Sequence, residues 1–536
     1  MILPFMKRLR YMFCVAAMLF SSCSFLDTYP EDFLTPDDFY ETEEELESAL
    51  LGVYATLAEG SLYSTNMLAR MGLSADIGYE RYTFDETSVG YYDVSTADSK
   101  ILGYWRELYD GIGRANVVLA NIDRPADMEQ EDRDLVEAQA RFLRAYYYFM
   151  LTTRFGDVPL ILEVPENGNK ENVQIPQTSQ REVYRYIISE MESVAEQLPD
   201  ASSLTGGGRL SKSAAYGILA RVAMYMAGNP LNEPGMYAKA KNYAKRVMDY
   251  NFHRLNPVYE DVFKNYIQDR YDIAESIFEV EFSMGGQSTY TLTAGQVGRM
   301  NGIYYYTVVD GKNSGQSLGA LRASSYFYEL FDATDVRRDW TIATYEFSSE
   351  TGDKVDIDPA DHWKRCCGKF RREYELTSSK DLVYTPINFP ILRYSDVLLM
   401  YAECVAADPE STAQELTDAY ECVNMVRRRG HGLDAETPDP SVDLVEEGKL
   451  ALLEEIKDER ARELGFELLR KDDLIRWGEL YSRMRAIRAT IPEHYVSSWY
   501  VAARLYYGNI SQRDVLWPIP AYEMGVNHQL VQNEGF

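Results

Sequence analysis

The chain has 536 residues, of which 46% are hydrophobic and 26% are charged. These proportions are those of soluble globular proteins, which excludes a disordered tail protein and a protein with many membrane spans. The 54 lysines and arginines are outnumbered by 84 aspartates and glutamates, so the formal net charge is −30. Because nucleic acid binds to basic surfaces, this balance argues against nucleic acid as a partner. The 42 tyrosines are twice the 21 phenylalanines, a bias that suits aromatic rings at a wet surface.

The amino terminus has the pattern of a secretory signal peptide. Lys7, Arg8 and Arg10 supply positive charge, and residues 11–20 form an uncharged apolar run of ten residues. A membrane span needs about 20 apolar residues, whereas the apolar core of a signal peptide has about 7 to 15. We therefore expect residues 1–22 to be a signal peptide that is removed on export.

The first residue after this segment is Cys23, which follows Ser21 and Ser22. The position resembles the bacterial lipoprotein processing site, where the cysteine is lipidated and becomes residue one, although Phe20 stands where leucine is usual. The resemblance implies a lipid anchor at Cys23. An ordinary cleaved signal peptide is the alternative. No other apolar run in the sequence approaches the length of a transmembrane helix.

Four cysteines remain besides Cys23 and the signal-segment Cys14, and they are Cys366, Cys367, Cys404 and Cys422. The first two are adjacent and lack the CxxC spacing of zinc sites, while the other two fall in helical patterns, where small buried thiols are common. We therefore expect no metal site at these cysteines, and no motif indicates a cofactor.

Apolar residues at helical spacing predict most of the ordered elements. The predicted helices, in chain order, are residues 41–58, 134–155, 180–198, 211–227, 237–250, 394–407, 413–429, 446–470 and 471–486. One alternating segment, residues 276–282, predicts a strand at the edge of a small sheet. The pair of helices within residues 211–250 resembles a tetratricopeptide repeat, since small residues allow the helices to approach closely.

Four segments between these helices lack a sustained period: residues 74–98, 283–325, 345–388 and 487–514. We expect long irregular loops here. Loops of this length in a compact domain are usually functional or disordered, and their aromatic content argues against disorder.

Catalytic motifs are few. The five histidines are scattered, without HxxxH or HxH spacing. Residues 206–213 (GGGRLSKS) resemble a phosphate-binding loop, but Ser211 replaces the glycine before Lys212 and no strand precedes it, so we expect a loop with a helix start at Ser211. Four aspartates in residues 353–361 miss the spacing of a calcium loop and indicate a solvated acidic turn.

Glu459 and Glu463 are one helical turn apart, as a catalytic carboxylate pair could be. Arg460 and Arg462 are interleaved with them, which favours ion pairs that hold helices together. A hydrolase whose carboxylates come from distant loops would leave no local motif and remains open.

The order of several segments resembles the SusD/RagB family of outer-membrane nutrient-binding lipoproteins. The similarity covers essentially the whole chain. It is carried by CSFLDTYPEDFLTPDDFYETEEELESALLGVY (23–54), YWRELYDGIGRANVVLANID (104–123), AQARFLRAYYYFMLTTRFGDVPL (138–160), GRLSKSAAYGILARVAMYMAG (208–228), PILRYSDVLLMYAE (390–403), IKDERARELGFELLRKDDLIRWG (456–478) and VLWPIPAYEMGVNHQLVQNEGF (515–536). The chain departs from the family at its end, where Glu534-Gly535-Phe536 replaces the frequent Pro-Gly-Tyr.

The resemblance implies a mainly α fold, a tetratricopeptide-like helical superhelix with long ligand-binding loops and a small amount of β. It implies one domain at residues 23–536, with a helical scaffold mainly at 41–58, 100–250 and 390–486 and ligand-face loops mainly at 74–98 and 283–388. The implied function is non-catalytic capture of a glycan at the cell surface of the outer membrane, and delivery to a SusC-like TonB-dependent barrel.

Aromatic residues in two loop segments are the candidates for ligand contact. A sugar ring has an apolar face and a polar rim, so its recognition requires an exposed aromatic ring beside polar side chains. The candidate residues are Tyr79, Arg81, Tyr82, Tyr91, Tyr92, Gln296, Asn301, Tyr304, Tyr305, Tyr306 and Trp340. Trp363 is a further candidate platform, whereas Trp105, Trp477 and Trp517 lie in scaffold segments and are expected in the core. Packing of half or more of these tyrosines onto the helices is the alternative.

Two other functions stay open on the sequence alone. Members of the RagB branch bind peptides, so the same fold could capture a peptide, and an acidic chain suits a basic cargo. A secreted glycan-cleaving enzyme is the third alternative.

Overall fold

The computed structural model describes residues 39–81, 87–164, 174–284, 294–306, 309, 314–377 and 380–536. The predicted signal peptide, Cys23 and Tyr82 lie outside these residues. None of the helices in the described ranges combines the length and apolar character needed to cross a bilayer.

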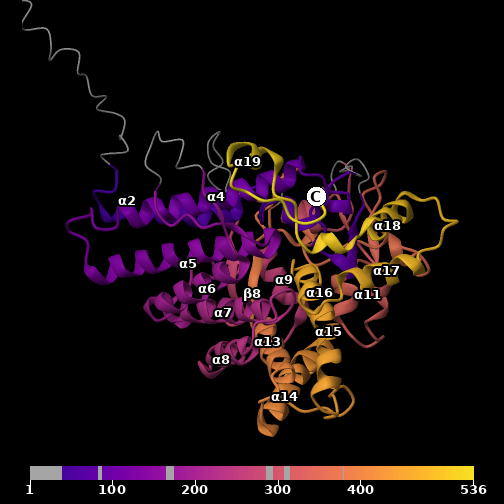
Figure 1. The fold of residues 1–536 in the computed structure, drawn as a ribbon. Coiled ribbons are helices and arrows are strands. Elements are labelled where there is room, and N and C mark those ends of the chain that lie inside the picture. The colour runs from indigo at the N-terminus through magenta and orange to yellow at the C-terminus, as the bar shows by residue number, and fades with distance from the viewer. Residues whose placement is uncertain are drawn as a thin grey trace, which may run out of the picture.

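Long helices stacked in chain order form the scaffold (Figure 1). They are α2 (Glu43–Ala55), α4 (Ser99–Ala120), α5 (Gln130–Phe155), α6 (Gln180–Val194), α7 (Lys212–Ala227), α8 (Met236–Asp249), α13 (Tyr394–Ala407), α14 (Ala413–Gly430) and α15 (Lys449–Leu464). Each of α4 to α8 packs on the next, and α13 then continues the stack by packing on α8, α14 and α15. The predicted mainly α, tetratricopeptide-like superhelix is confirmed.

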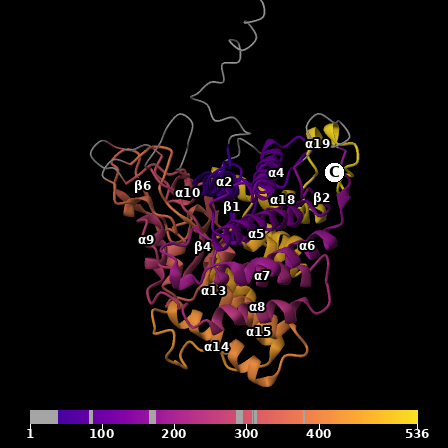
Figure 2. The same cartoon turned by 90° about the vertical axis from the view of Figure 1, so that its left-hand side faces the viewer.

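Shorter elements lie beside this stack, and the loop-rich segment that carries α9, α10 and β6 forms one side of the molecule in Figure 2. The shorter helices are α3 (Asn66–Ala69), α9 (Tyr259–Ile267), α10 (Val297–Asn301), α11 (Ser325–Glu329), α12 (Arg337–Thr341), α16 (Arg470–Arg476), α17 (Leu480–Thr490), α18 (Ser498–Asn509) and α19 (Ala521–Val526). The strands form antiparallel pairs: β1 (Gly78–Glu80) with β5 (Leu321–Ala323), β2 (Val158–Pro159) with β3 (Gln177–Thr178), β4 (Ser276–Val280) with β8 (Phe389–Arg393), and β6 (Tyr345–Phe347) with β7 (Lys354–Asp356).

Local sequence signals set many helix ends where they were predicted. The Ser211 hydroxyl accepts a hydrogen bond from the backbone N–H of Ala214 at 3.1 Å, so residues 206–213 are a loop followed by the N-cap of α7, as expected. Gly156, with φ +72°, ends α5. The strand predicted at 276–282 is confirmed as β4, and all five of its residues are buried.

The structure corrects the prediction at two places in the carboxy-terminal third. The helices expected at 446–470 and 471–486 are instead α15, α16 and α17. Gly465 has extended backbone (ψ 134°) and ends α15, and Gly478, with φ +75°, separates α16 from α17. Residues 487–514 were expected to be irregular, but they contain α18. Tyr500, Ala503 and Tyr507 of α18 lie on one helical face and are buried, which stabilises a helix in this tyrosine-rich segment.

The core has two main parts. The larger part fills the helical stack. The smaller part joins α16 to α18 to the loop at residues 75–92 and includes Trp363. Trp105 and Trp517 are buried and Trp477 is partly buried, as expected of scaffold tryptophans.

Glu279 in β4 gives the fold a pH dependence. Burial raises the pKa of Glu279 from 4.5 to about 7, although Ser276 and Asn388 donate hydrogen bonds to its carboxyl group. The folded state therefore holds this proton more tightly than the unfolded chain does. The resulting stability is fully present below pH 4.5 and is lost as the pH rises through about 7.

We predict that Glu279→Gln removes this loss, because the amide has no charge to bury. In thermal denaturation the variant should melt at a higher temperature than the parent at pH 8, and near pH 4 the two should differ little. The exposed Glu43→Gln serves as the control and should follow the parent at both pH values. A variant that melts lower than the parent at pH 8 would contradict this assignment.

Candidate functional site

The tyrosines predicted in the first loop segment are buried. The Tyr79 hydroxyl donates to the Trp363 carbonyl at 2.6 Å, and the Tyr91 hydroxyl donates to the Glu80 carbonyl at 2.7 Å. The Tyr92 hydroxyl donates to the Gly72 carbonyl at 2.6 Å. These three rings therefore fasten the loop to the fold, in line with the alternative that the loop tyrosines serve packing.

Several candidates in the second segment are also buried. Asn301 and Tyr305 have no exposed surface, and Trp340 is 4% exposed. The Tyr305 ring packs 5.1 Å from that of Phe347, and the Arg371 guanidinium lies 4.3 Å from the centre of the Trp340 ring. Trp363 is buried beside Tyr79. None of these rings offers a free face to a ligand in this structure.

Two of the remaining candidates, Arg81 and Tyr304, meet beside Arg322, which the sequence analysis did not predict. We call Arg81, Tyr304, Arg322 and the nearby chain residue Tyr306 the Tyr304 corner. Tyr306 is 52% exposed and Tyr304 is half-buried. The guanidiniums of Arg81 and Arg322 lie 4.4 and 5.9 Å from the centre of the Tyr304 ring. Aromatic and cationic groups thus meet here. Gln296, also half-buried, precedes α10, and its backbone N–H donates to the Ser64 carbonyl at 2.9 Å.

Arg322 is the buried member of the corner. It is 2% exposed, and its Nε and Nη1 atoms have no hydrogen-bond partner among the described residues. An unpaired buried donor is costly, and such groups are commonly satisfied by water or by a ligand.

A second aromatic surface, which the sequence analysis did not predict, lies at the start of α18. We call it the α18 shelf and define it as His494, Tyr495, Trp499, Tyr500 and Asp361. The rings of Tyr495 and Tyr500 are stacked at 4.6 Å and 18°, and Tyr495 is 45% exposed. The Trp499 indole N–H donates to the Asp361 carboxylate at 3.3 Å. The sequence signal for this surface was the repeated aromatic pairs of α18, which are Trp499-Tyr500 and Tyr506-Tyr507. It was missed because this segment was expected to be a loop.

One continuous piece of structure connects the two surfaces. In the β1–β5 pair, Tyr79 lies opposite Arg322, and Arg322 forms a β-bridge with Cys366. The 3₁₀ turn η8 (His362–Lys364) lies just before this bridge and contacts both β5 and α18. The Tyr304 corner and the α18 shelf are therefore connected through β5 and η8, and we call the two surfaces together the loop face.

The scaffold holds the loop face through a buried ion pair. The Nε and Nη2 atoms of Arg470 in α16 donate to the two carboxylate oxygens of Asp76, each at 2.7 Å. The Ser324 hydroxyl donates to the Asp76 carbonyl at 2.7 Å, which ties β5 to the same point. Bidentate pairing restricts orientation as well as distance, so β1 and β5 are fixed relative to the helices.

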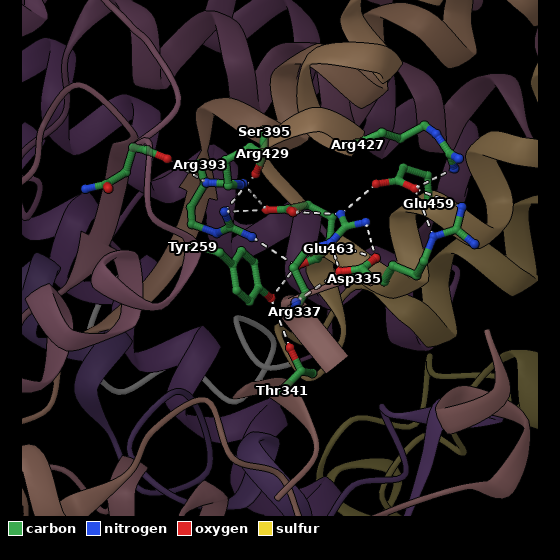
Figure 3. Close-up of polar contacts among 12 residues, drawn as sticks. Tyr259, Asp335, Arg337, Thr341, Arg393, Ser395, Arg427, Arg429, Glu459 and Glu463 are labelled. Carbon is green, nitrogen blue, oxygen red and sulfur yellow. Dashed lines mark hydrogen bonds and ion pairs between the residues drawn. The ribbon is translucent and has the colours of Figure 1, made fainter. Parts of the chain in front are cut away.

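The carboxylate pair Glu459 and Glu463 belongs to the scaffold (Figure 3). Glu463 accepts from Arg429 at 2.7 Å and from Arg393 at 2.9 Å. Arg337 donates to Glu459 at 2.6 Å and to Glu463 at 3.2 Å, so one guanidinium connects the two carboxylates. The predicted role in ion pairs between helices is confirmed.

The charges around this pair determine its protonation. Although burial opposes ionisation, the neighbouring arginines lower the pKa of Glu459 to about 2 and hold the pKa of Glu463 well below its usual range. A catalytic general acid needs a raised pKa. The pair is therefore unsuited to glycosidic acid catalysis.

The other motifs offer little chemistry. The four cysteines in the described part of the chain are buried and form no disulfide there, and burial raises the pKa of Cys367 and Cys422 to about 12, so these two thiols are poor nucleophiles at neutral pH. No group of three or more metal-ligating side chains with suitable geometry occurs in the described residues.

We predict that Glu463→Ala lowers the free energy of unfolding by about 3–5 kcal/mol, because buried guanidiniums lose their counter-charge. Urea denaturation at pH 7 measures the change. Asp249→Ala is the matched control, since it removes an exposed ion pair with Lys245 and should cost at most about 1 kcal/mol. If both variants lose the same small amount, the buried pairs are not a major source of stability.

The sequence matches known protein families and relatives over most of its length. Residues 274–536 match the family model described as "SusD family", and residues 24–224 match the model described as "Starch-binding associating with outer membrane". The chain is 26% identical to the SusD-like protein P2 of Formosa agariphila over 542 residues, which cover 98% of this chain and 99% of the relative.

Solved structures show the same fold. A SusD homologue from Bacteroides thetaiotaomicron has a TM-score of 0.82 and 25% identity, and the match covers 93% of this chain and 98% of that one. A structure named "Laminarin binding SusD-like protein" has a TM-score of 0.71 and 22% identity, covering 93% of this chain and all of that one. This second likeness bears on the fold alone.

Proposed function

Since the chain belongs to the SusD/RagB family, we propose that it binds a glycan without cleaving it and presents that glycan to an outer-membrane transporter. The observation that carries the proposal is the loop face, where exposed aromatic rings stand beside charged groups on a rigid scaffold. Tyr304 lies beside Arg81, and Tyr306 is exposed two residues further along the chain. On the α18 shelf, the exposed Tyr495 stacks on Tyr500, and Trp499 donates to Asp361.

The description of one matching family supports carbohydrate as the cargo. That family, which covers residues 24–224, is described as "Starch-binding associating with outer membrane". An aromatic face accepts the apolar side of a sugar ring, while arginine and aspartate can bond the hydroxyl rim.

Binding rather than cleavage is supported by the state of the carboxylates. Glu459 and Glu463 are ionised and form ion pairs with arginines. Glu279, whose pKa is raised, is only 3% exposed and is therefore not accessible to a ligand. A direct test incubates the purified protein with starch and laminarin oligosaccharides and with a basic peptide pool. We expect retention of an oligosaccharide without new reducing ends. Release of reducing ends in proportion to protein concentration would make the protein an enzyme, and retention of peptides alone would indicate peptide capture.

We propose the outer membrane as the location, with a lipid on Cys23 as the anchor and a SusC-like TonB-dependent barrel as the partner. The family description "associating with outer membrane" supports the location. The anchor and the barrel rest on the resemblance of residues 20–23 to a lipoprotein site and on the family.

Tyr304→Ala should weaken glycan binding by about 1–3 kcal/mol, or roughly tenfold to more than a hundredfold, if the ring stacks on the sugar as aromatic rings stack on bases. Tyr304→Phe should cost much less, because the apolar face remains. Calorimetric titration measures both. Tyr522→Ala is the control, since Tyr522 is 60% exposed on α19, outside the loop face. Equal binding by the parent and Tyr304→Ala, with unchanged melting temperatures, would remove Tyr304 from the site.

Cys23→Ala should release the protein from the outer-membrane fraction of a native-like host, because bacterial lipoproteins hold the membrane through acyl chains on this cysteine. Fractionation and immunoblotting measure the release. Cys14→Ala is the matched control, since Cys14 lies in the predicted signal peptide. Retention of Cys23→Ala in membranes of a strain that lacks the partner barrel would refute the anchor.

A further inference from the structure

The α17–α18 hairpin contains a basic groove that the loop face does not explain. The two helices pack against each other at one side of the molecule (Figure 1). Between them lies a groove of about 610 Å³, a size within the usual range of ligand sites. Its charged lining residues are Arg485, Arg488, Arg504 and Glu493.

The arginines of this groove are only partly neutralised. Glu493 pairs with Arg488 at 2.7 Å but lies 3.8 Å from Arg504, and its side chain is 71% exposed. Arg504 donates to the Pro492 carbonyl at 2.9 Å, and Arg485 donates to the Gly508 carbonyl at 3.2 Å. Two of the three guanidiniums are therefore held in place mainly by backbone oxygens. Three arginines and one glutamate give the lining a formal net charge of +2.

A basic groove is unusual in a chain with a net charge of −30. At physiological salt the Debye length is about 8 Å, so the distant acidic surface is largely screened while charges inside the groove act at contact distance. The local arginines therefore determine which ligand enters. Guanidinium forks bind planar carboxylates and sulfate-like oxyanions through paired hydrogen bonds. The Glu493 carboxylate already pairs with one of these guanidiniums, that of Arg488.

An aromatic surface borders the groove. Tyr500 lies one helical turn before Arg504 in α18, and residues four apart on a helix are neighbours. Tyr495, stacked on Tyr500, is two residues from Glu493 and is 45% exposed. An exposed ring next to an arginine groove suits a ligand that has both a sugar face and an acidic group.

We propose that the α17–α18 groove binds the carboxylate or sulfate groups of an acidic saccharide, while the adjacent α18 shelf contacts its rings. This inference rests on the proposed glycan binding and narrows its cargo to an anionic glycan. Glu493 occupies the groove in the absence of ligand and competes with the ligand's acidic group for Arg488.

The test uses matched pairs of probes: oligogalacturonate with its neutral methyl ester, and sulfated dextran oligosaccharide with unsulfated dextran. Calorimetric titration of the full chain should show at least tenfold tighter binding of one acidic probe than of its neutral partner, and this preference should weaken at high salt. Equal binding within both pairs, or no binding of either acidic probe, would overturn the proposal.

Variants assign the effect to the groove. Arg488→Gln/Arg504→Gln should lower affinity for the acidic probe at least tenfold, whereas Arg185→Gln, which alters an exposed arginine on α6, should not. Glu493→Gln should raise affinity, because it removes the internal competitor. A lower or unchanged affinity of Glu493→Gln would overturn the proposal, even if the double variant loses stability and melts early.

Two outcomes distinguish acidic-glycan binding in the groove from lipid binding there and from the proposed function as a whole. Arginine-dependent binding to phosphatidylglycerol vesicles, without binding to either acidic saccharide, would make the groove a lipid contact and overturn the proposal. If neutral oligosaccharides bind through Tyr304 and the double variant binds all probes as the parent does, the proposed function stands and the groove inference fails alone.

Discussion

The arrangement of the molecule depends on the ion pairs that the buried Glu463 carboxylate makes with three arginines. Placing ions in a protein interior costs several kcal/mol for each charge unless partners and hydrogen bonds compensate. Here Glu463 in α15 connects Arg393 at the end of β8, Arg429 in α14 and Arg337 in α12. These groups come from distant parts of the sequence, so satisfying all of these ion pairs restricts how the elements can be placed relative to one another.

Charged residues just after α15 connect this ion-pair core to the loop face. Glu467 bonds Lys369 and Arg393, and it lies between Phe466 and Leu468, whose φ values are +64° and +67°. Left-handed backbone at such residues is unfavourable and persists where the surroundings fix it. Three residues further on, Arg470 holds Asp76. The turn between α15 and α16 thus links the ion-pair core to β1, and with it to the loop face.

The scaffold was largely predictable from the sequence, and the ligand surface was not. Apolar periodicity and caps such as Ser211 depend on local chemistry, and the interleaved arginines at Glu459 and Glu463 correctly indicated ion pairs. The exposure of a tyrosine depends on tertiary packing instead. Tyr79, Tyr91 and Tyr92 are buried because α18 covers them, and this helix was expected to be a loop.

A scaffold fixed by buried ion pairs that holds exposed aromatic rings in place suits a binding protein, since preorganised groups lose little entropy when the ligand arrives. Hydrogen–deuterium exchange with and without a bound oligosaccharide tests this account most directly. We predict slower exchange at residues 78–81, 300–306 and 494–500, and unchanged exchange at 456–478, which the ion pairs already protect. Protection confined to α4 and α19, with none on the loop face, would contradict it.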